Sequence, residues 1–142
     1  MPRQIGPGLN RGMFLLLLLL AAMLYGCSTV EKASKNQKLH LQLQSYDHAV
    51  RWGELADAYT YMRPEDMPTV IPEGLDNIRV TSYEEIGPVI NLDENKVSRK
   101  VRIEYVLRDR QVVKTLIDNQ IWEYDSEIDQ WFRVNPPPEF AD

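Results

Sequence analysis

The chain has 142 residues, a formal net charge of −5 and a single cysteine. This length is enough for one domain with one hydrophobic core. The acidic balance argues against nucleic acid and anionic lipid headgroups as general partners. One cysteine excludes an intramolecular disulfide and a thiolate metal cluster.

An apolar run close to the N-terminus is the clearest signal in the sequence. It extends from Met13 to Leu24, includes six consecutive leucines and follows Arg3 and Arg11. A run of this length fits the core of a secretory signal peptide and is shorter than the roughly 20 residues needed to cross a bilayer. We therefore expect residues 1–26 to be a signal peptide, with an uncleaved membrane anchor as the alternative.

The end of this run resembles the lipobox of bacterial lipoproteins, in which a small residue precedes a cysteine that is acylated and becomes the mature N-terminus. Leu24, Gly26 and Cys27 match that pattern, whereas Tyr25 is bulkier than usual at its position. The resemblance implies signal cleavage between Gly26 and Cys27. It also implies a diacylglyceryl thioether on Cys27, usually with an amide-linked acyl chain such as palmitate. Two or more acyl chains anchor a protein durably in the lipid bilayer.

The residue after the cysteine bears on the destination. It is Ser28, not the aspartate that commonly retains lipoproteins at the inner membrane. In a Gram-negative host the resemblance implies attachment to the outer membrane, with the domain in the periplasm. Cleavage removes two arginines, so the mature chain would carry a formal charge of about −7.

The next segment, residues 27–37, is polar and has almost no large apolar side chains. Such a composition predicts a tether behind the acylated N-terminus. A frayed first turn of the following helix is compatible with the same residues.

Apolar residues then recur at helical spacing, at Leu39, Leu43, Tyr46 and Val50. This stripe predicts an amphipathic helix. Gly53 interrupts the pattern, and a second apolar run continues to Met62 before Pro64 ends it. We expect one long helix, a bend near Trp52-Gly53 and a second, shorter helix.

Beyond a proline-rich loop at residues 63–76, the apolar period changes to two, which predicts strands. The expected strands cover residues 78–85, 97–107, 111–125 and 131–134, with a short apolar stretch at 89–92. The strand at 97–107 keeps its apolar residues on one face, and only Arg99 breaks the pattern. The strand at 111–125 has apolar residues on both faces, which indicates either a central strand or a bulge. Pro136-Pro137-Pro138 cannot join a ladder, so we expect the tail at 136–142 to leave the sheet extended.

Helices followed by meandering strands predict an α+β fold, in which a helix pair packs on a curved, cone-like antiparallel sheet. Residues 38–135 resemble the nuclear transport factor 2-like (cystatin-like) superfamily. The resemblance rests on the order of elements, on the break at Arg51-Trp52-Gly53 and on the tryptophans Trp122 and Trp131 of the last two strands. The superfamily includes isomerases, dehydratases and many binding or accessory domains, so the fold alone does not decide the function.

Few residues could support chemistry. His40 and His48 are eight positions apart on the first predicted helix, too far to share a metal. Tyr59, Asp57 and Asp118 could line the mouth of the cone, but they match no motif of the superfamily's isomerases. We therefore predict no catalytic, metal-binding or cofactor-binding residue.

Four aromatic residues form a candidate cluster at one end of the sheet: Tyr105, Trp122, Tyr124 and Trp131. Core packing is the favoured interpretation. The alternative is a pocket for an apolar ligand or a surface for a partner protein.

The sequence thus favours a non-enzymatic binding or accessory lipoprotein of the bacterial envelope, which contacts the bilayer through acylated Cys27 and holds an envelope protein. A small isomerase- or dehydratase-like enzyme acting on an apolar substrate is the alternative, and a lipoprotein that spaces the envelope is a third. A deep cavity with a buried Asp or His would favour the enzyme. A filled cone with an apolar outer patch would favour the binding domain.

Overall fold

The computed structural model describes residues 11–141, and among their side chains all but those of residues 22–27. The chain divides into two compact units, Met1–Gln37 and Lys38–Asp142. The first unit contributes the beginning of helix α1, Arg11–Trp52, so the segment expected to be a tether is helical. Among the described residues, no helix combines the length and apolarity that crossing a membrane requires.

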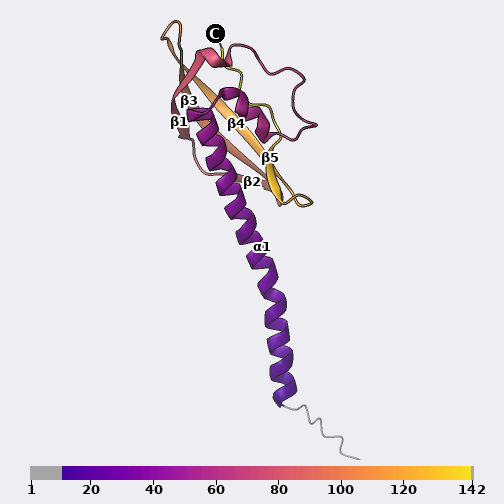
Figure 1. Ribbon diagram of the computed structural model, residues 1–142. Coiled ribbons are helices and arrows are strands. Elements are labelled where there is room, and N and C mark those ends of the chain that lie inside the picture. The colour runs from indigo at the N-terminus through magenta and orange to yellow at the C-terminus, as the bar shows by residue number, and fades with distance from the viewer. Residues whose placement is uncertain (1–10, 142) are drawn as a thin grey trace, which may run out of the picture. The chain divides into compact units, whose positions relative to one another are not determined.

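The second unit contains the end of α1 and all the remaining elements (Figure 1). Two 3-10 helices follow α1: η1 at Leu55–Tyr61 and η2 at Leu75–Asn77. The strands are β1 Ile78–Glu85, β2 Ile90–Asp93, β3 Lys96–Leu107, β4 Val113–Asp125 and β5 Gln130–Arg133.

Helix α1 ends where the sequence predicts the bend. The backbone N–H of Gly53 donates to the carbonyl of Ala49 at 2.9 Å. A Cβ atom at Gly53 would lie 2.8 Å from that same carbonyl oxygen, so only glycine fits this closing turn. The expected second, shorter helix is η1, a seven-residue 3-10 helix that ends just before Met62. Only a few residues separate Gly53 from Pro64, and short connections favour tight turns of this kind.

The strands form one antiparallel sheet in the order β1-β3-β4-β5, with β2 pairing with β3. β4 pairs with β3 without interruption from Val113 to Glu123, so it has no bulge against β3, and it is a central strand only where β5 also pairs with it, from Trp122 to Asp125. The irregular pairings lie elsewhere, between Val80 and Ser82 in β1 and between Asn91 and Asp93 in β2.

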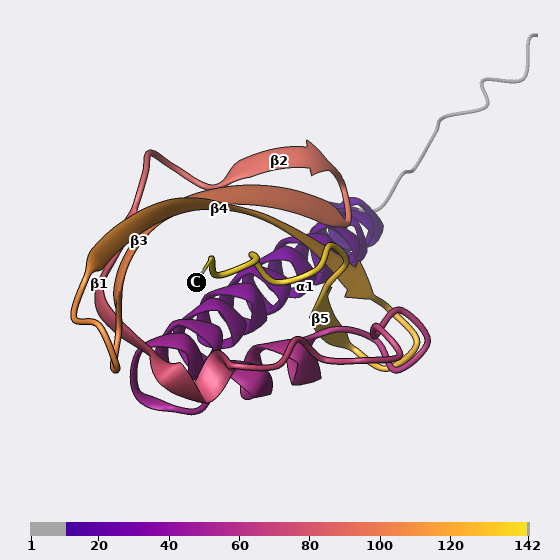
Figure 2. The ribbon, with the colours of Figure 1, turned by 90° about the horizontal axis from the view of Figure 1, so that it is seen from above.

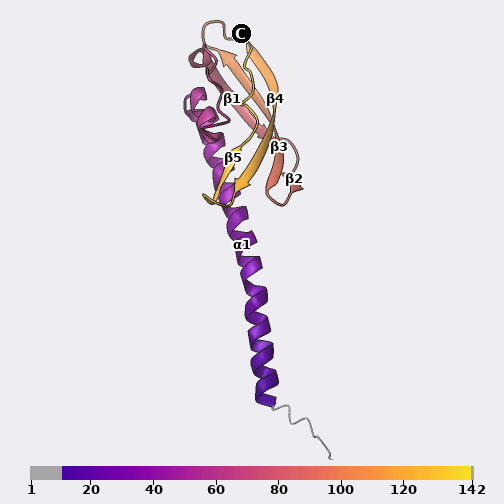
Figure 3. The same cartoon turned by 90° about the vertical axis from the view of Figure 1, so that its right-hand side faces the viewer.

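The sheet curls into a half-barrel, and the end of α1 lies across its hollow (Figure 2). A side view shows two layers, with the helices on one side and the strands on the other (Figure 3). The core joins both layers: Leu43, Tyr46 and Val50 of α1 pack with the inward residues of β3 and β4. This is an α+β fold in which N-terminal helices pack on a curled antiparallel sheet.

The C-terminal segment stays outside the sheet ladders, as expected, but it does not leave the domain. It runs inside the curve of the sheet (Figure 2). The Tyr105 hydroxyl donates to the Ala141 carbonyl at 3.2 Å and accepts from the Ala141 N–H at 3.1 Å. The ring of Phe140 packs edge-on against Tyr105, with centroids 5.0 Å apart. The tail at 136–142 is therefore part of the folded unit as far as it is described.

Candidate functional site

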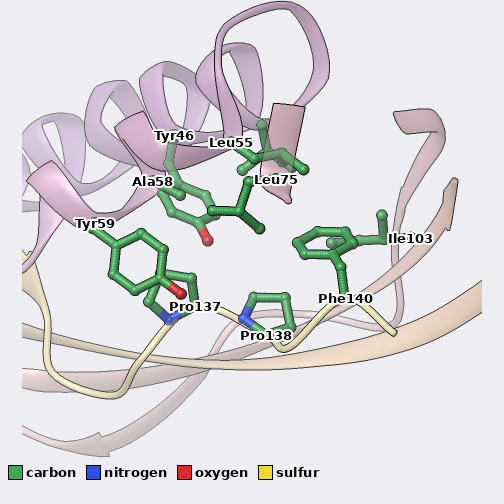
Figure 4. A pocket seen from close by; sticks show the side chains of 10 residues that line it. Tyr46, Leu55, Ala58, Tyr59, Leu75, Ile103, Pro137, Pro138 and Phe140 are labelled. Atoms are coloured by element: carbon green, nitrogen blue, oxygen red, sulfur yellow. The ribbon is translucent and has the colours of Figure 1, made fainter. Parts of the chain in front are cut away.

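The hollow of the half-barrel is where this fold could enclose a ligand, and the described side chains nearly fill it. Tyr46 approaches from α1, Leu55 and Tyr59 from η1, and Pro137 and Phe140 from the C-terminal segment (Figure 4). The cavity that remains among them is about 10 Å³. This is the room that one water molecule needs. The aliphatic, aromatic and proline groups around it make it a small gap in an apolar core. A larger and more open depression of about 650 Å³ lies over Arg79, Val106, Arg108 and Gln111.

A buried polar cluster lies beside this gap and consists of Tyr46, Tyr83, Asp118, Gln120 and Arg133. Its centre is an ion pair in which Arg133 Nη2 lies 2.6 Å from Asp118 Oδ1 and Arg133 Nη1 lies 2.9 Å from Asp118 Oδ2. Arg133 is 0% exposed and Asp118 is 2% exposed. A buried pair of this kind is held only if the remaining polar groups are also satisfied.

The remaining groups of Arg133 do find partners. Nη1 donates to the Tyr46 hydroxyl at 2.5 Å, Nη2 to the Pro136 carbonyl at 2.9 Å and Nε to the Asn135 carbonyl at 2.9 Å. Burial lowers the pKa of Arg133 and the hydrogen-bonded Asp118 raises it, with a net upward shift. Arg133 therefore stays charged and fastens the start of the C-terminal segment to the core.

Asp118 is equally occupied. Besides both bonds from Arg133, its Oδ2 accepts from Gln120 Nε2 at 2.9 Å. Gln120 also donates to the Tyr83 hydroxyl at 2.8 Å and accepts from Trp122 Nε1 at 3.1 Å. Through these hydrogen bonds the Asp118 carboxylate connects β4 with β5, and Gln120 connects β4 with β1. Both carboxylate oxygens of Asp118 accept at least one hydrogen bond. The arrangement suits a structural role better than acid–base chemistry.

A second arginine explains the one break in the strand pattern. Arg99 lies on the buried face of β3 and is 5% exposed. Its Nη1 and Nη2 donate to the two oxygens of Asp47 in α1, at 2.9 and 2.8 Å, and Nη2 lies 3.3 Å from Glu85 Oε2. This ion pair therefore links α1 to β3 on the buried face of the sheet.

The aromatic residues predicted as a core or a partner surface are mostly core. Tyr105, Trp122 and Trp131 are at most 2% exposed, and Tyr124 is half-buried. Trp122 packs edge-on against Tyr46, with centroids 5.3 Å apart, and Tyr124 lies 5.4 Å from Trp131. Three of these four side chains therefore have no surface to offer a partner.

The other predicted residues are dispersed. His40 and His48 are exposed on α1. The described part of the chain has no group of three or more His, Cys, Asp or Glu placed to hold a metal ion. Gly26 and Cys27 belong to α1, and their side chains fall outside the described set.

The outer face of the sheet carries exposed apolar residues that the sequence interpretation did not assign to a site. Val113 is 64% and Ile117 is 45% exposed on β4, and Ile90 is 56% exposed on β2. The signal that could have found those of β4 is its pattern of apolar residues on both faces, because the sheet has helices on only one side.

Compared with known proteins, the chain matches no family model, no curated protein and no solved structure. The case for its function therefore rests on its own sequence pattern and geometry.

Proposed function

We propose that this protein is a membrane-anchored lipoprotein of the bacterial envelope whose domain is a non-enzymatic binding or accessory module of the nuclear transport factor 2-like type. The observation that carries the binding role is the filled hollow, in which about 10 Å³ remains. A domain whose described side chains leave no room for a substrate in the hollow, and whose outer face carries apolar residues, is suited to bind through its surface.

The buried polar cluster supports the same conclusion. An acid–base site needs a titratable group with access to the substrate. Asp118 is the best-placed candidate, and its two oxygens accept bonds from Arg133 and Gln120. The enzyme alternative would have to break this cluster and displace the C-terminal segment before a substrate could enter.

The anchoring part of the proposal rests on the sequence pattern that ends at Cys27. A charged N-terminal region, an apolar run and the Leu-Tyr-Gly-Cys sequence occur in the order expected of a lipoprotein signal. Acylation would give the domain a bilayer contact that no side chain of the folded unit has to supply. Ser28 then favours the outer membrane of a Gram-negative host, with the domain in the periplasm.

The anchoring proposal is tested by replacing the acylated residue in the full chain. We expect Cys27→Ser to abolish incorporation of labelled palmitate, to leave an unprocessed precursor and to remove the mature protein from the membrane fraction. Ser28→Ala is the matched control and should keep all three properties. Palmitate labelling that persists in Cys27→Ser would overturn the assignment.

A second variant tests the destination separately from the lipid. Ser28→Asp should keep palmitate incorporation and move the protein from the outer to the inner membrane fraction in a Gram-negative host. Unchanged sedimentation with the outer membrane would contradict the role given to Ser28, while leaving the acylation itself standing.

A further inference from the structure

One stretch of β4 has a free edge. β5 pairs with β4 only from Trp122 to Asp125. Just before that, Asn135 takes the place of a strand: its Oδ1 accepts from the Ile121 N–H at 2.8 Å and its Nδ2 donates to the Asn119 carbonyl at 2.7 Å. The segment then turns into the hollow of the sheet (Figure 2). The part of β4 before Asn119 therefore has β3 on one side, and among the described residues no strand pairs with it on the other.

The contacts of Asn135 also show how the β4 backbone is oriented. The N–H of Ile121 and the carbonyls of Asn119 and Ile121 point away from β3. Alternate residues of a strand face the same neighbour, and β4 pairs with β3 without a bulge. The backbone N–H and C=O groups of Val113, Thr115 and Ile117 therefore point outward too, and among the described residues nothing bonds them.

This edge differs from the outer edges of β1 and β5. β1 has an irregular pairing and carries Glu84 and Glu85 near its end, and the far side of β5 forms a bridge through Arg133 to Met62. Bulges, charges and covering segments are the usual protection of strand edges. The stretch Val113–Ile117 has only Lys114, whose ammonium faces the hollow and donates to the Ala141 carbonyl at 3.1 Å.

We propose that the open stretch of β4, Val113–Ile117, pairs antiparallel with the same stretch of a second copy of this chain. Thr115 would lie opposite the partner's Thr115 across a two-fold axis. The two sheets would become one continuous sheet. This interface is isologous, as expected for a dimer that closes on itself. The proposal does not depend on the membrane anchor.

The register follows from what limits the open stretch at each end. Toward Asp125, the carbonyl of Asn119 is already bonded to Asn135. Toward the preceding turn, Gln111 has a φ of 50° and cannot continue an extended ladder. Centring the pair on Thr115 is the arrangement in which all three outward residues bond to one another, each pair exchanging both backbone hydrogen bonds.

The side chains are self-complementary in this register, which is why the occupant is a second copy. On the outer face, Val113 lies opposite the partner's Ile117, and threonine lies opposite threonine. Apolar β-branched pairs and threonine pairs are among those that stabilise antiparallel strands. On the inner face, Lys114 lies opposite the partner's Leu116, so no like charges are directly opposed. The stretch has no acidic residue, although the chain as a whole carries −5.

Cysteine cross-linking in whole cells tests both the contact and its register. Thr115→Cys in the full chain should form a disulfide-linked dimer with a permeant oxidant. The expected Cα separation of about 5.5 Å lies within the range that disulfides bridge. The parent chain, which has Cys27 alone, is the blank. Thr81→Cys, an exposed position on β1, is the matched control and should remain a monomer.

The register of the proposed strand pair can be tested separately, by cross-linking the two positions that it places opposite each other. Val113→Cys and Ile117→Cys should each give little dimer when expressed alone and a strong mixed dimer when expressed together with different tags. Equal cross-linking at Thr81 and Thr115 would mean random collision and would overturn the proposal. A Thr115→Cys adduct with a different protein would overturn the second copy as the occupant.

A proline substitution separates pairing from folding. Thr115→Pro removes an N–H that faces outward, so the ladder between β3 and β4 keeps its bonds, and proline is tolerated on edge strands. In the paired Val113→Cys and Ile117→Cys chains, this change should abolish the mixed dimer while the melting temperature stays within about 3 °C, because no hydrogen bond among the described residues uses that N–H. A mixed dimer that survives Thr115→Pro in a folded chain would contradict the pairing. Ile117→Lys in a Thr115→Cys chain should weaken the dimer in the same way, because an edge lysine opposes pairing.

Discussion

The two halves of β4 have similar apolar content in the sequence and opposite environments in the structure. From Asp118 to Trp122 the inward side chains are buried under α1. The strand has β3 on one side, and the segment of β5, Val134 and Asn135 bonds to its other side from Asn119 onward. From Val113 to Ile117 the outward side chains are exposed, and one edge is open. The difference shows that apolar residues on both faces of a strand do not imply that both faces are covered.

The distribution of polar residues along β4 is the opposite of the usual one, in which polar side chains are exposed and apolar side chains are buried. The covered half buries Asp118 and Gln120, whereas the open half exposes Val113 and Ile117. Burial of a carboxylate is possible there because Arg133 of β5 lies beside it with matched geometry. The covered half of β4 therefore stabilises the fold, and the open half exposes apolar side chains that a partner could contact.

The largest expected effect comes from removing the charge that holds the covered half together. Arg133→Met should lower the free energy of unfolding by about 3–5 kcal/mol, because it leaves Asp118 buried without its partner. Chemical denaturation measures this loss. The double variant Arg133→Met with Asp118→Leu is the control and should recover part of it. A single variant within about 0.5 kcal/mol of the parent, the range of ordinary surface substitutions, would contradict the structural role.

A matched pair of truncations on β4 compares the two halves directly. Trp122→Ala should cost about 3 kcal/mol or more, because it empties a site in contact with Tyr46. Ile117→Ala, on the exposed half, should stay within about 0.5 kcal/mol. Denaturation midpoints of the two variants give the comparison. Similar costs at both positions would mean that the halves do not differ as described.

High pH should have a smaller and reversible effect on stability, through the tyrosines of the buried polar cluster that contacts the covered half. Burial raises the pKa of both Tyr46 and Tyr83 above the ordinary value of 10.0. The folded protein therefore holds these phenolic protons more tightly than the unfolded chain. Their contribution to stability is complete below pH 10 and is lost progressively as the pH rises above that value.

Denaturation midpoints measured between about pH 8 and 11, across the ordinary tyrosine pKa, check this slope. Tyr83→Phe should flatten the decline of stability with pH, because it removes one of the two buried phenolic groups from the polar cluster. A stability that does not change above pH 10 would contradict the burial of these hydroxyls.

Much of the fold could be predicted from local patterns. The end of α1, the bounds of β1 and β3 and the buried face of β3 follow from spacing that each segment carries by itself. The 3-10 geometry of η1 and the position of the irregular pairings were not predictable in the same way. They depend on how many residues remain between packed elements and on how neighbouring strands curl.

The candidate site could be predicted only in part. Aromatic residues were recognised as a cluster, but apolarity alone does not separate a core tryptophan such as Trp122 from one on a contact surface. The open edge of β4 was missed because it depends on the length of β5 and on Asn135, which lies outside every strand.

The sequence by itself determined the order of helices and strands, since backbone periodicity is a local property. It also carries the lipobox-like pattern on which the anchoring proposal rests. The tertiary structure decided which charges are buried, how the C-terminal segment closes the hollow and which strand edge stays open. Arg133 meets Asp118 across 15 positions and Arg99 meets Asp47 across 52. Partners that far apart in the chain leave no periodic signal, because only the folded backbone brings them within bonding distance.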